Sequence, residues 1–160
     1  MEKIYLLIGT NIGNLKENLE NAFEQLNSNN IKILKKSRIY KTKPWGKTDQ
    51  PDFLNIAVEV ETPFTPEMLL KKIKEIERKM KRKTLEKWGP RIIDIDILFY
   101  GSAQINKPNL IIPHPQFFNR PFAIVPLADI APDFIPPFSQ KKVKELISGE
   151  MNEGIEVYHN

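Results

Sequence analysis

The chain has 160 residues, the length of one ordinary domain, and its 41% hydrophobic and 28% charged residues exclude a disordered chain. The absence of cysteine excludes disulfides, thiolate zinc sites and cysteine nucleophiles. A formal net charge of +4 permits an anionic partner but does not distinguish nucleic acid from a polyphosphate. We therefore expect a single domain over residues 1–160.

The N-terminal segment predicts a strand followed by a helix. Residues 4–8 are continuously apolar, a pattern typical of a buried strand and too short to span a membrane. Residues 9–13 lack the Lys-Ser/Thr of a Walker loop and are interpreted only as a strand-to-helix turn. Asn14 with Glu17 forms a capping box, and apolar residues recur at helical spacing as far as Leu26. No signal-peptide cleavage site follows, so we expect a cytoplasmic location.

The middle of the chain predicts two more strands and a second helix. Residues 31–40 alternate loosely between apolar and polar, and a long polar stretch over 41–52 separates this strand from another over 53–61. Thr65, just before a proline, is a suitable helix N-cap, and an apolar stripe then extends to Met80. We expect this stripe to pack against the sheet.

A basic connector over 81–90 leads to a fourth strand over 91–99, so the elements follow the order β-α-β-β-α-β. This order predicts an α+β fold with a ferredoxin-like core, in which helices pack on a mainly antiparallel sheet. Short helices are expected over 120–127 and 141–146 in the proline-rich remainder. That remainder forms a C-terminal extension of the same domain.

Two carboxylates lie on the predicted fourth strand. Asp94 and Asp96 share one face and are about 7 Å apart along the chain. The opposite face is apolar and carries Ile93, Ile95, Ile97 and Phe99. Neighbouring carboxylates repel each other, and Mg²⁺, which takes one or two protein carboxylates together with water and phosphate oxygens, removes that repulsion. The alternative is that both acids face solvent on an edge strand.

Cations and an aromatic residue gather just before these acids. Five basic side chains fall within eleven positions, where they can converge on a polyphosphate and neutralise charge during phosphoryl transfer. They are Lys81, Arg82, Lys83, Lys87 and Arg91. Trp88 is suited to stacking on a flat heterocycle. A solvated basic loop with a core tryptophan is the alternative.

These features are part of a wider pattern. The chain resembles the hydroxymethyldihydropterin pyrophosphokinases of the folate pathway in six motifs that occur in order over most of its length. The motifs are residues 8–14, 40–46, 49–55, 88–91 with the two acids, 113–115, and 119–122. Their number and family-like spacing make the resemblance specific.

The resemblance implies an ATP-dependent diphosphotransferase. Family members transfer pyrophosphate from ATP to 6-hydroxymethyl-7,8-dihydropterin, which yields AMP and the pterin diphosphate for folate biosynthesis. Two Mg²⁺ ions are expected with ATP as co-substrate. We expect small-molecule substrates as the partners, a monomer, and neither nucleic acid nor a membrane.

The resemblance also implies roles for individual residues. Asp94 and Asp96 match the acids that hold the metal, and Arg82 and Arg91 match catalytic cations that act on the phosphates. The pterin pocket is implied at Thr42, Trp45, Phe53, Asn55, Trp88 and Phe122. The ATP side is implied at Glu77, Arg82, Arg91, Ile97, His114 and Arg120.

The chain departs from the family pattern at two places. The family usually has Gly-Arg-x-Arg where residues 81–84 read Lys-Arg-Lys-Thr, so one arginine is replaced by threonine. Phe53 stands where tyrosine is common, which keeps the ring and loses a hydroxyl. From the residues alone, Glu77 is explained equally well by a structural hydrogen bond, and His114 by a position in a surface loop.

Two other functions fit the predicted fold. A ferredoxin-like RNA-binding module would use the basic surface, but the aromatic-rich strand motif of such modules is missing from the sequence. A two-metal nucleotidyl transferase would release pyrophosphate rather than AMP, so the product distinguishes it.

Overall fold

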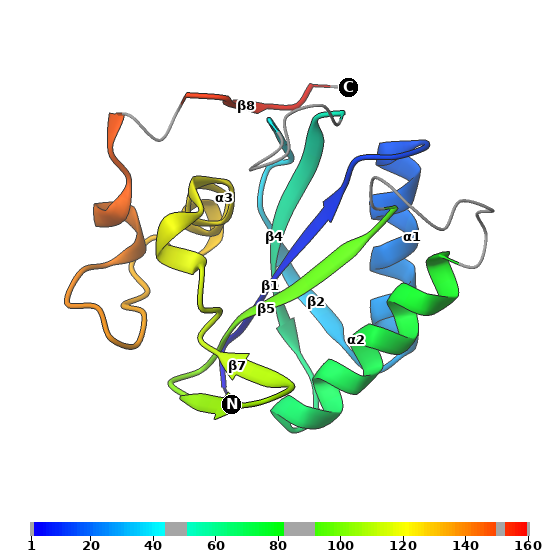
Figure 1. Cartoon of the computed structure of the whole chain (residues 1–160), viewed down its shortest axis with the longest axis horizontal. Helices are drawn as coiled ribbons and strands as arrows, with labels where there is room; N and C mark the ends of the chain where they lie inside the picture. The colour runs from blue at the N-terminus through cyan, green and yellow to red at the C-terminus, as the bar shows by residue number, and fades with distance from the viewer. Residues whose placement is uncertain (1, 44–50, 82–91, 150–152, 160) are drawn as a thin grey trace.

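The computed structural model describes residues 2–43, 51–81, 92–149 and 153–159 of the chain (Figure 1). The strands are β1 (Ile4–Thr10), β2 (Lys32–Lys36), β3 (Tyr40–Thr42), β4 (Phe53–Glu61), β5 (Asp94–Tyr100), β6 (Ile105–Lys107), β7 (Leu110–Ile112) and β8 (Ile155–Val157). The helices are α1 (Leu15–Ser28), α2 (Pro66–Lys81) and α3 (Pro121–Ile130), with 3-10 turns η1 (Phe117–Asn119) and η2 (Val143–Leu146). No helix in these described ranges is long and apolar enough to cross a membrane.

The main sheet is antiparallel and has the order β5-β1-β4-β3-β8, while β2 also pairs with β4. The last strand of the predicted βαββαβ unit, β5, therefore lies beside the first, as a ferredoxin-like sheet requires. The α+β prediction is confirmed. β6 and β7 form a separate hairpin.

The single strand predicted over 31–40 is wrong, because the chain forms β2 and β3 with Ser37 between them. The backbone N–H of Ser37 donates to the carbonyl of Ala57, and its Oγ accepts the N–H of the same residue, both at 2.9 Å. A serine side chain thus replaces one backbone partner of β4 and interrupts the ladder.

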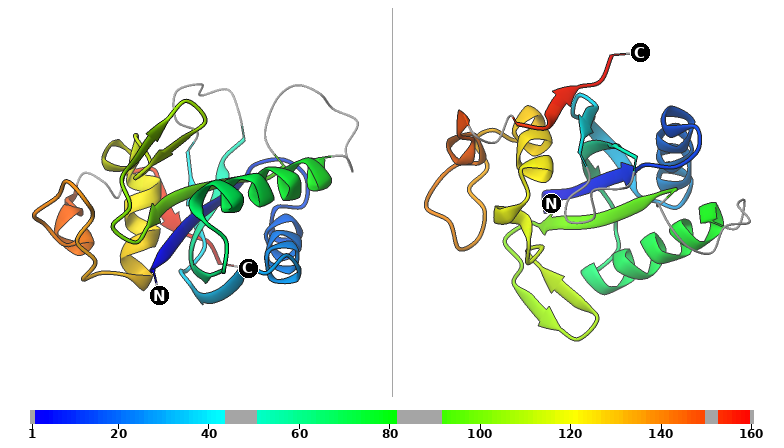
Figure 2. Two further views of the ribbon diagram at one scale, coloured as in Figure 1. Left: turned by 90° about the horizontal axis from the view of Figure 1, so that it is seen from below. Right: turned by 45° about the horizontal axis from the view of Figure 1, so that its top comes forward.

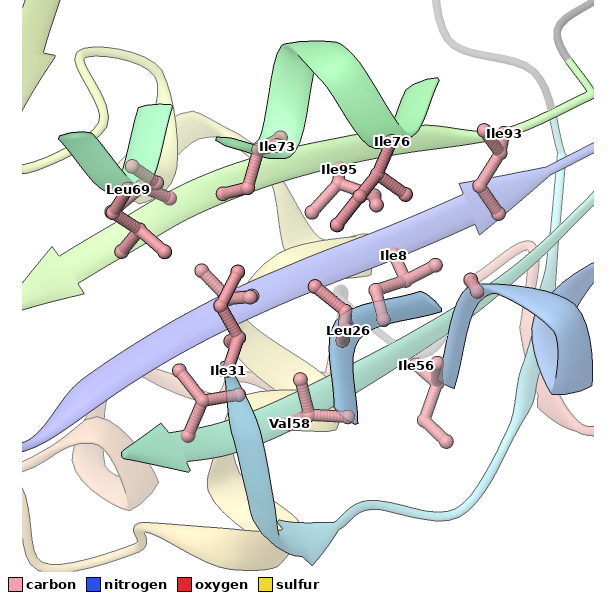
Figure 3. Close-up of a cluster of buried hydrophobic side chains, with 14 of the residues drawn as sticks. Ile8, Leu26, Ile31, Ile56, Val58, Leu69, Ile73, Ile76, Ile93 and Ile95 are labelled. Atoms are coloured by element: carbon pink, nitrogen blue, oxygen red, sulfur yellow. The ribbon is translucent and has the colours of Figure 1, made fainter. Parts of the chain in front are cut away.

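α1 and α2 cover one face of the sheet, and Figure 3 shows the apolar side chains that meet there. Asn14 Oδ1 accepts the N–H of Glu17 at 3.1 Å, so α1 begins where the capping pattern predicts. The stripe of α2 is buried through Leu69 and Ile73, which are 0% exposed. Each such side chain contributes about 1.5–3 kcal/mol to the free energy of folding.

α3 covers the opposite face (Figure 1), over a second cluster that includes Tyr5, Leu98 and Phe99. The prediction that Phe99 shares a face with Ile97 is wrong. Tyr5 pairs with Phe99 while Leu6 pairs with Ile97, so Leu98 is an extra residue that reverses the alternation of β5.

A carboxylate ties α3 to the sheet. Asp129 accepts hydrogen bonds from the backbone N–H of Arg38 and from its guanidinium, each at 3.1 Å. The Tyr40 hydroxyl donates to the same carboxylate at 2.8 Å. These contacts hold the C-terminal end of α3 on the strand that leads to the candidate site.

Other boundaries also differ from the sequence prediction. β5 begins at Asp94 rather than at residue 91, and the helix expected over 141–146 is the 3-10 turn η2. The helix expected over 120–127 is confirmed as α3, which extends to Ile130. The β6–β7 hairpin and β8 were not predicted, because each of these strands has only three residues, too few to show a strand pattern.

Candidate active site

The floor of the site is a row of residues across three strands. In the antiparallel pairing, Gly9 of β1 lies between Asn55 of β4 and Asp94 of β5. Two residues away on β1, Leu7 pairs with Asp96. Because residues two apart on a strand project to the same face, all these positions open toward the side covered by α3.

A cavity of about 180 Å³ lies over this floor. Its lining comes from the sheet, from the residue after β3 and from the start of α3. It consists of Leu7, Gly9, Thr42, Lys43, Phe53, Asn55, Asp94, Asp96, Arg120 and Phe122. The structure thus brings together four residues expected in the pterin pocket and both expected metal acids. A cavity lined by two aromatic rings and by buried polar groups suits a flat heterocycle.

A buried amide shapes this first cavity. Asn55 is 5% exposed, and its Nδ2 donates to the Thr42 hydroxyl, itself 3% exposed, at 2.7 Å. A Cβ on Gly9 would lie 2.7 Å from Asn55 Oδ1, closer than real Cβ atoms approach an oxygen. The glycine therefore makes room for the amide, a role that the interpretation as a strand-to-helix turn missed.

The charges of the two acids influence each other. The pKa of Asp96 is raised to about 6, first by burial of the carboxyl and then by the charge of Asp94. Arg120 opposes this increase, and its Nη1 lies 3.9 Å from Asp96 Oδ2. A carboxylate that is costly to ionise beside a second carboxylate is a favourable place for a cation.

A second cavity of about 260 Å³ opens on the other side of Asp96. It lies between β5, α2 and the β6–β7 hairpin. Its lining is Leu70, Lys74, Ile95, Asp96, Ile97, Pro108, Asn109, Leu110, Ile111, His114 and Pro115. Ile97 and His114, both expected on the ATP side, are therefore together, whereas Arg120 lines the first cavity.

His114 is held in place by two backbone contacts. Its N–H donates to the carbonyl of Leu98 at 3.0 Å, and its Nδ1 accepts the N–H of Gln116 at 3.1 Å. Burial, followed by the charge of Arg120, lowers the pKa of His114 to about 4. The ring is thus neutral at pH 7, and because Nδ1 accepts a hydrogen bond, its proton lies on Nε2.

Glu77 makes a structural hydrogen bond, which is the alternative that the sequence offered beside a role on the ATP side. It is 2% exposed, and its Oε2 accepts the N–H of Ile95 at 2.8 Å. Its Oε1 lies 3.4 Å from Lys74 Nζ. Glu77 lines neither cavity, but it holds β5 at the residue between the two acids.

Four of the expected site residues lie in parts of the chain that the structure does not describe. Trp45, Arg82, Trp88 and Arg91 lie outside the described residues, so their predicted roles stay predictions. Within the described ranges no group of three or more metal-ligating side chains occurs. The lining residues that were not predicted include Lys43, which lies within the motif over 40–46, and Lys74, whose only signal was its positive charge.

Comparisons with known proteins give one consistent result. The family model of 7,8-dihydro-6-hydroxymethylpterin-pyrophosphokinase (HPPK) matches residues 5–132. A 2-amino-4-hydroxy-6-hydroxymethyldihydropteridine pyrophosphokinase of Methylorubrum extorquens is 41% identical over 157 residues, which are 98% of this chain and 98% of that protein. The enzyme of the same description from Aquifex aeolicus is 40% identical over 145 residues, covering 91% and 90% of the two chains.

A solved structure leads to the same fold. An HPPK-DHPS in complex with substrates superimposes with a TM-score of 0.78 at 15% identity, over 98% of this chain and 46% of that chain. The present chain therefore spans just under half of that protein, and the likeness concerns the fold alone. The family match and the two relatives show that the chain belongs to the 7,8-dihydro-6-hydroxymethylpterin-pyrophosphokinase family, whose members transfer pyrophosphate from ATP to hydroxymethyldihydropterin in folate biosynthesis.

Proposed function

We propose that the transfer takes place where the two cavities meet, with the pterin in the first cavity and ATP in the second. The observation that carries this assignment is the position of Asp96, which lines both cavities. Two substrates bound on either side of one carboxylate are in place for direct transfer between them.

The first cavity supplies the contacts that a pterin needs. Phe53 and Phe122 offer aromatic faces to the ring, and Asn55, fixed by Thr42, offers an amide to its polar edge. Because the amide and the hydroxyl already pair, the polar surface is ordered before the substrate arrives. The hydroxymethyl group would then point toward the acids.

The second cavity suits the nucleotide. Ile97 and Leu110 give it apolar walls, and neutral His114 offers its Nε2–H as a hydrogen-bond donor. Lys74 adds a positive charge beside Asp96. An ATP bound here would extend its phosphates toward Asp96 and the first cavity.

Asp94 and Asp96 are suited to hold Mg²⁺. Carboxylate oxygens are its preferred protein ligands, and burial, followed by repulsion from Asp94, raises the pKa of Asp96, a cost of ionisation that a dication would offset. When bound there, the metal would neutralise charge on the triphosphate. Two ions with ATP remain our expectation, as do a monomer and a cytoplasmic location.

In the proposed reaction the hydroxymethyl oxygen of the pterin attacks the β-phosphorus of ATP. The new O–P bond replaces the bond to the oxygen that links the α- and β-phosphates, and AMP leaves with that electron pair while the hydroxyl proton is lost to water. The contribution of the protein is to position both substrates, exclude water and balance charge. The guanidinium of Arg120, whose Nη1 lies 3.9 Å from Asp96 Oδ2, can contribute to this charge balance.

The assignment is tested by two substitutions with opposite expected effects. Phe122→Ala should raise the KM for the pterin about tenfold and change the KM for ATP less than about twofold, since loss of a ring stacked on a flat heterocycle costs about 1–3 kcal/mol. His114→Ala should do the reverse. AMP release at varied concentrations of each substrate measures both.

Each variant has a matched control. Phe118→Ala removes an exposed ring from the same segment, and His159→Ala removes the other histidine of the chain. Both should behave as the wild type. If Phe122→Ala raised the KM for ATP instead, or if both variants affected the two substrates equally, the assignment of the cavities would be wrong.

A further inference from the structure

The strand β8 lies beyond residue 132, where the family match ends, yet it joins the sheet next to the candidate site. In the antiparallel pairing with β3, Thr42 lies opposite Ile155 and Tyr40 opposite Val157. Figure 2 shows β8, in red, along this end of the sheet. The last strand of the chain is thus a direct neighbour of a residue that lines the first cavity.

Two hydrogen bonds extend this pairing beyond the strands. The N–H of Lys43 donates to the carbonyl of Gly154 at 3.1 Å, and the N–H of Tyr158 donates to the carbonyl of Ile39 at 2.8 Å. β3 has only three residues, and β8 covers the edge that β4 leaves open. A strand this short with one free edge is weakly held, so β8 fixes both β3 and the residue that follows it.

A groove of about 300 Å³ connects the two features. Its lining is Thr42, Lys43, Pro121, Phe122, Glu153, Gly154 and Ile155. Thr42, Lys43 and Phe122 line the first cavity as well. These three residues therefore form a wall that has the cavity on one side and β8 on the other.

We propose that β8 is a positioning element of the pterin pocket, which holds Thr42 and Lys43 where they contact the pterin. This inference rests on the proposed assignment of the first cavity to the pterin. It assigns a role in recognition of one substrate to the C-terminal strand, and it predicts that weakening β8 impairs pterin binding while ATP binding is retained.

Gly154 offers a graded way to weaken this contact. Its φ of +78° is a conformation that asparagine tolerates, that alanine adopts with strain and that valine strongly disfavours. A Cβ at this position would meet Lys43 only at ordinary contact distance, so backbone strain rather than collision is the perturbation. Gly149 is a matched control, because a Cβ there would meet nothing within 4 Å.

The experiment measures the KM for each substrate and the melting temperature of the full-length chain. We expect the KM for the pterin to rise little for Gly154→Asn, about threefold for Gly154→Ala and about tenfold for Gly154→Val, following the increasing strain. The KM for ATP should stay within about twofold of the wild type. Gly149→Ala should leave all values unchanged. A variant that ends at residue 152 should show at least the effect of Gly154→Val.

Two results would overturn the proposal. One is an unchanged KM for the pterin in Gly154→Val and in the shortened chain; the other is an equal rise for both substrates that follows only the loss of melting temperature. Phe122→Ala in the same assay separates the two levels of inference. If Phe122→Ala raises the KM for the pterin and the Gly154 variants do not, only the role of β8 is wrong; if neither does, the pocket assignment itself fails.

Discussion

Replacement of Asp96 by asparagine should make the metal-free protein more stable while it removes activity. The pKa of Asp96 is about 6 rather than its ordinary 3.8, so ionisation of this carboxyl opposes folding at neutral pH. The whole difference corresponds to about 3 kcal/mol. The side chain is 30% exposed, and water screens part of this cost. We therefore expect Asp96→Asn to raise the free energy of unfolding by about 1–2 kcal/mol.

The size of this effect depends on pH in a defined way. Below pH 3.8 the carboxyl is protonated in the folded and the unfolded chain, so its ionisation costs nothing. Between pH 3.8 and about 6 the unfolded chain loses the proton first, and the stability of the wild type falls as pH rises. The gain from asparagine should be only a fraction of its full value at pH 4 and should be complete above pH 7. For a domain of this size it amounts to about 2–8 °C in Tm.

Thermal unfolding followed by circular dichroism, in a chelator and from pH 4 to pH 8, measures the gain. Asp133→Asn is the control, because Lys144 and Lys142 lower the pKa of this exposed carboxyl and its removal should not stabilise the chain at any pH. An Asp96→Asn variant that melts no higher than the wild type at pH 7.5, or whose gain is the same at pH 4, would refute the reasoning. With Mg²⁺ and ATP added, the wild type should gain stability that the variant does not.

Three further substitutions test individual contacts. Gly9→Ala should displace the Asn55 amide and raise the Kd for the pterin about tenfold by titration calorimetry, with the Kd for ATP unchanged; equal losses for both ligands would contradict this. Glu77→Ala should lower the free energy of unfolding in urea by about 1–3 kcal/mol, because the N–H of Ile95 loses its acceptor. Glu77→Gln should lower it less, because the amide oxygen can still accept that N–H. Asp129→Ala should lower the free energy of unfolding by about 2–3 kcal/mol, because the donors of Arg38 and Tyr40 lose their acceptor together. A loss below about 0.5 kcal/mol would show that the contact does not anchor α3.

The order of the core elements was predictable because local patterns determine it. The cap at Asn14 and the apolar stripe of α2 are readable in a single segment, and both are found in the structure. The division of the strand over 31–40 was not predictable, since it depends on Ser37 reaching Ala57 of another strand. The three-residue strand β8 was missed for the same reason, because its partner β3 lies more than a hundred positions away in the sequence.

Several residues that line the two cavities were predictable from the sequence, but their arrangement was not. The alternation around Asp94 and Asp96 correctly separated the acids from Ile93 and Ile95, which are buried under the helices. That these acids lie in one row with Gly9 follows only from the register of β1 with its two neighbours. No spacing in the sequence indicates that Asp96 lines two cavities.

The extra residue in β5 shows why the alternation was a correct guide at one end of the strand and a wrong one at the other. Leu98 and Phe99 both pack under α3, so the bulge lets one strand direct acids into the site and, a few residues later, aromatic bulk into the core on the same side. The carbonyl of Leu98, the extra residue, accepts the N–H of His114. The histidine of the second cavity is therefore anchored at the irregular position of the strand that carries the acids, a position that a sequence pattern cannot reveal. Any insertion or deletion in β5 should for this reason affect the core and both halves of the site together.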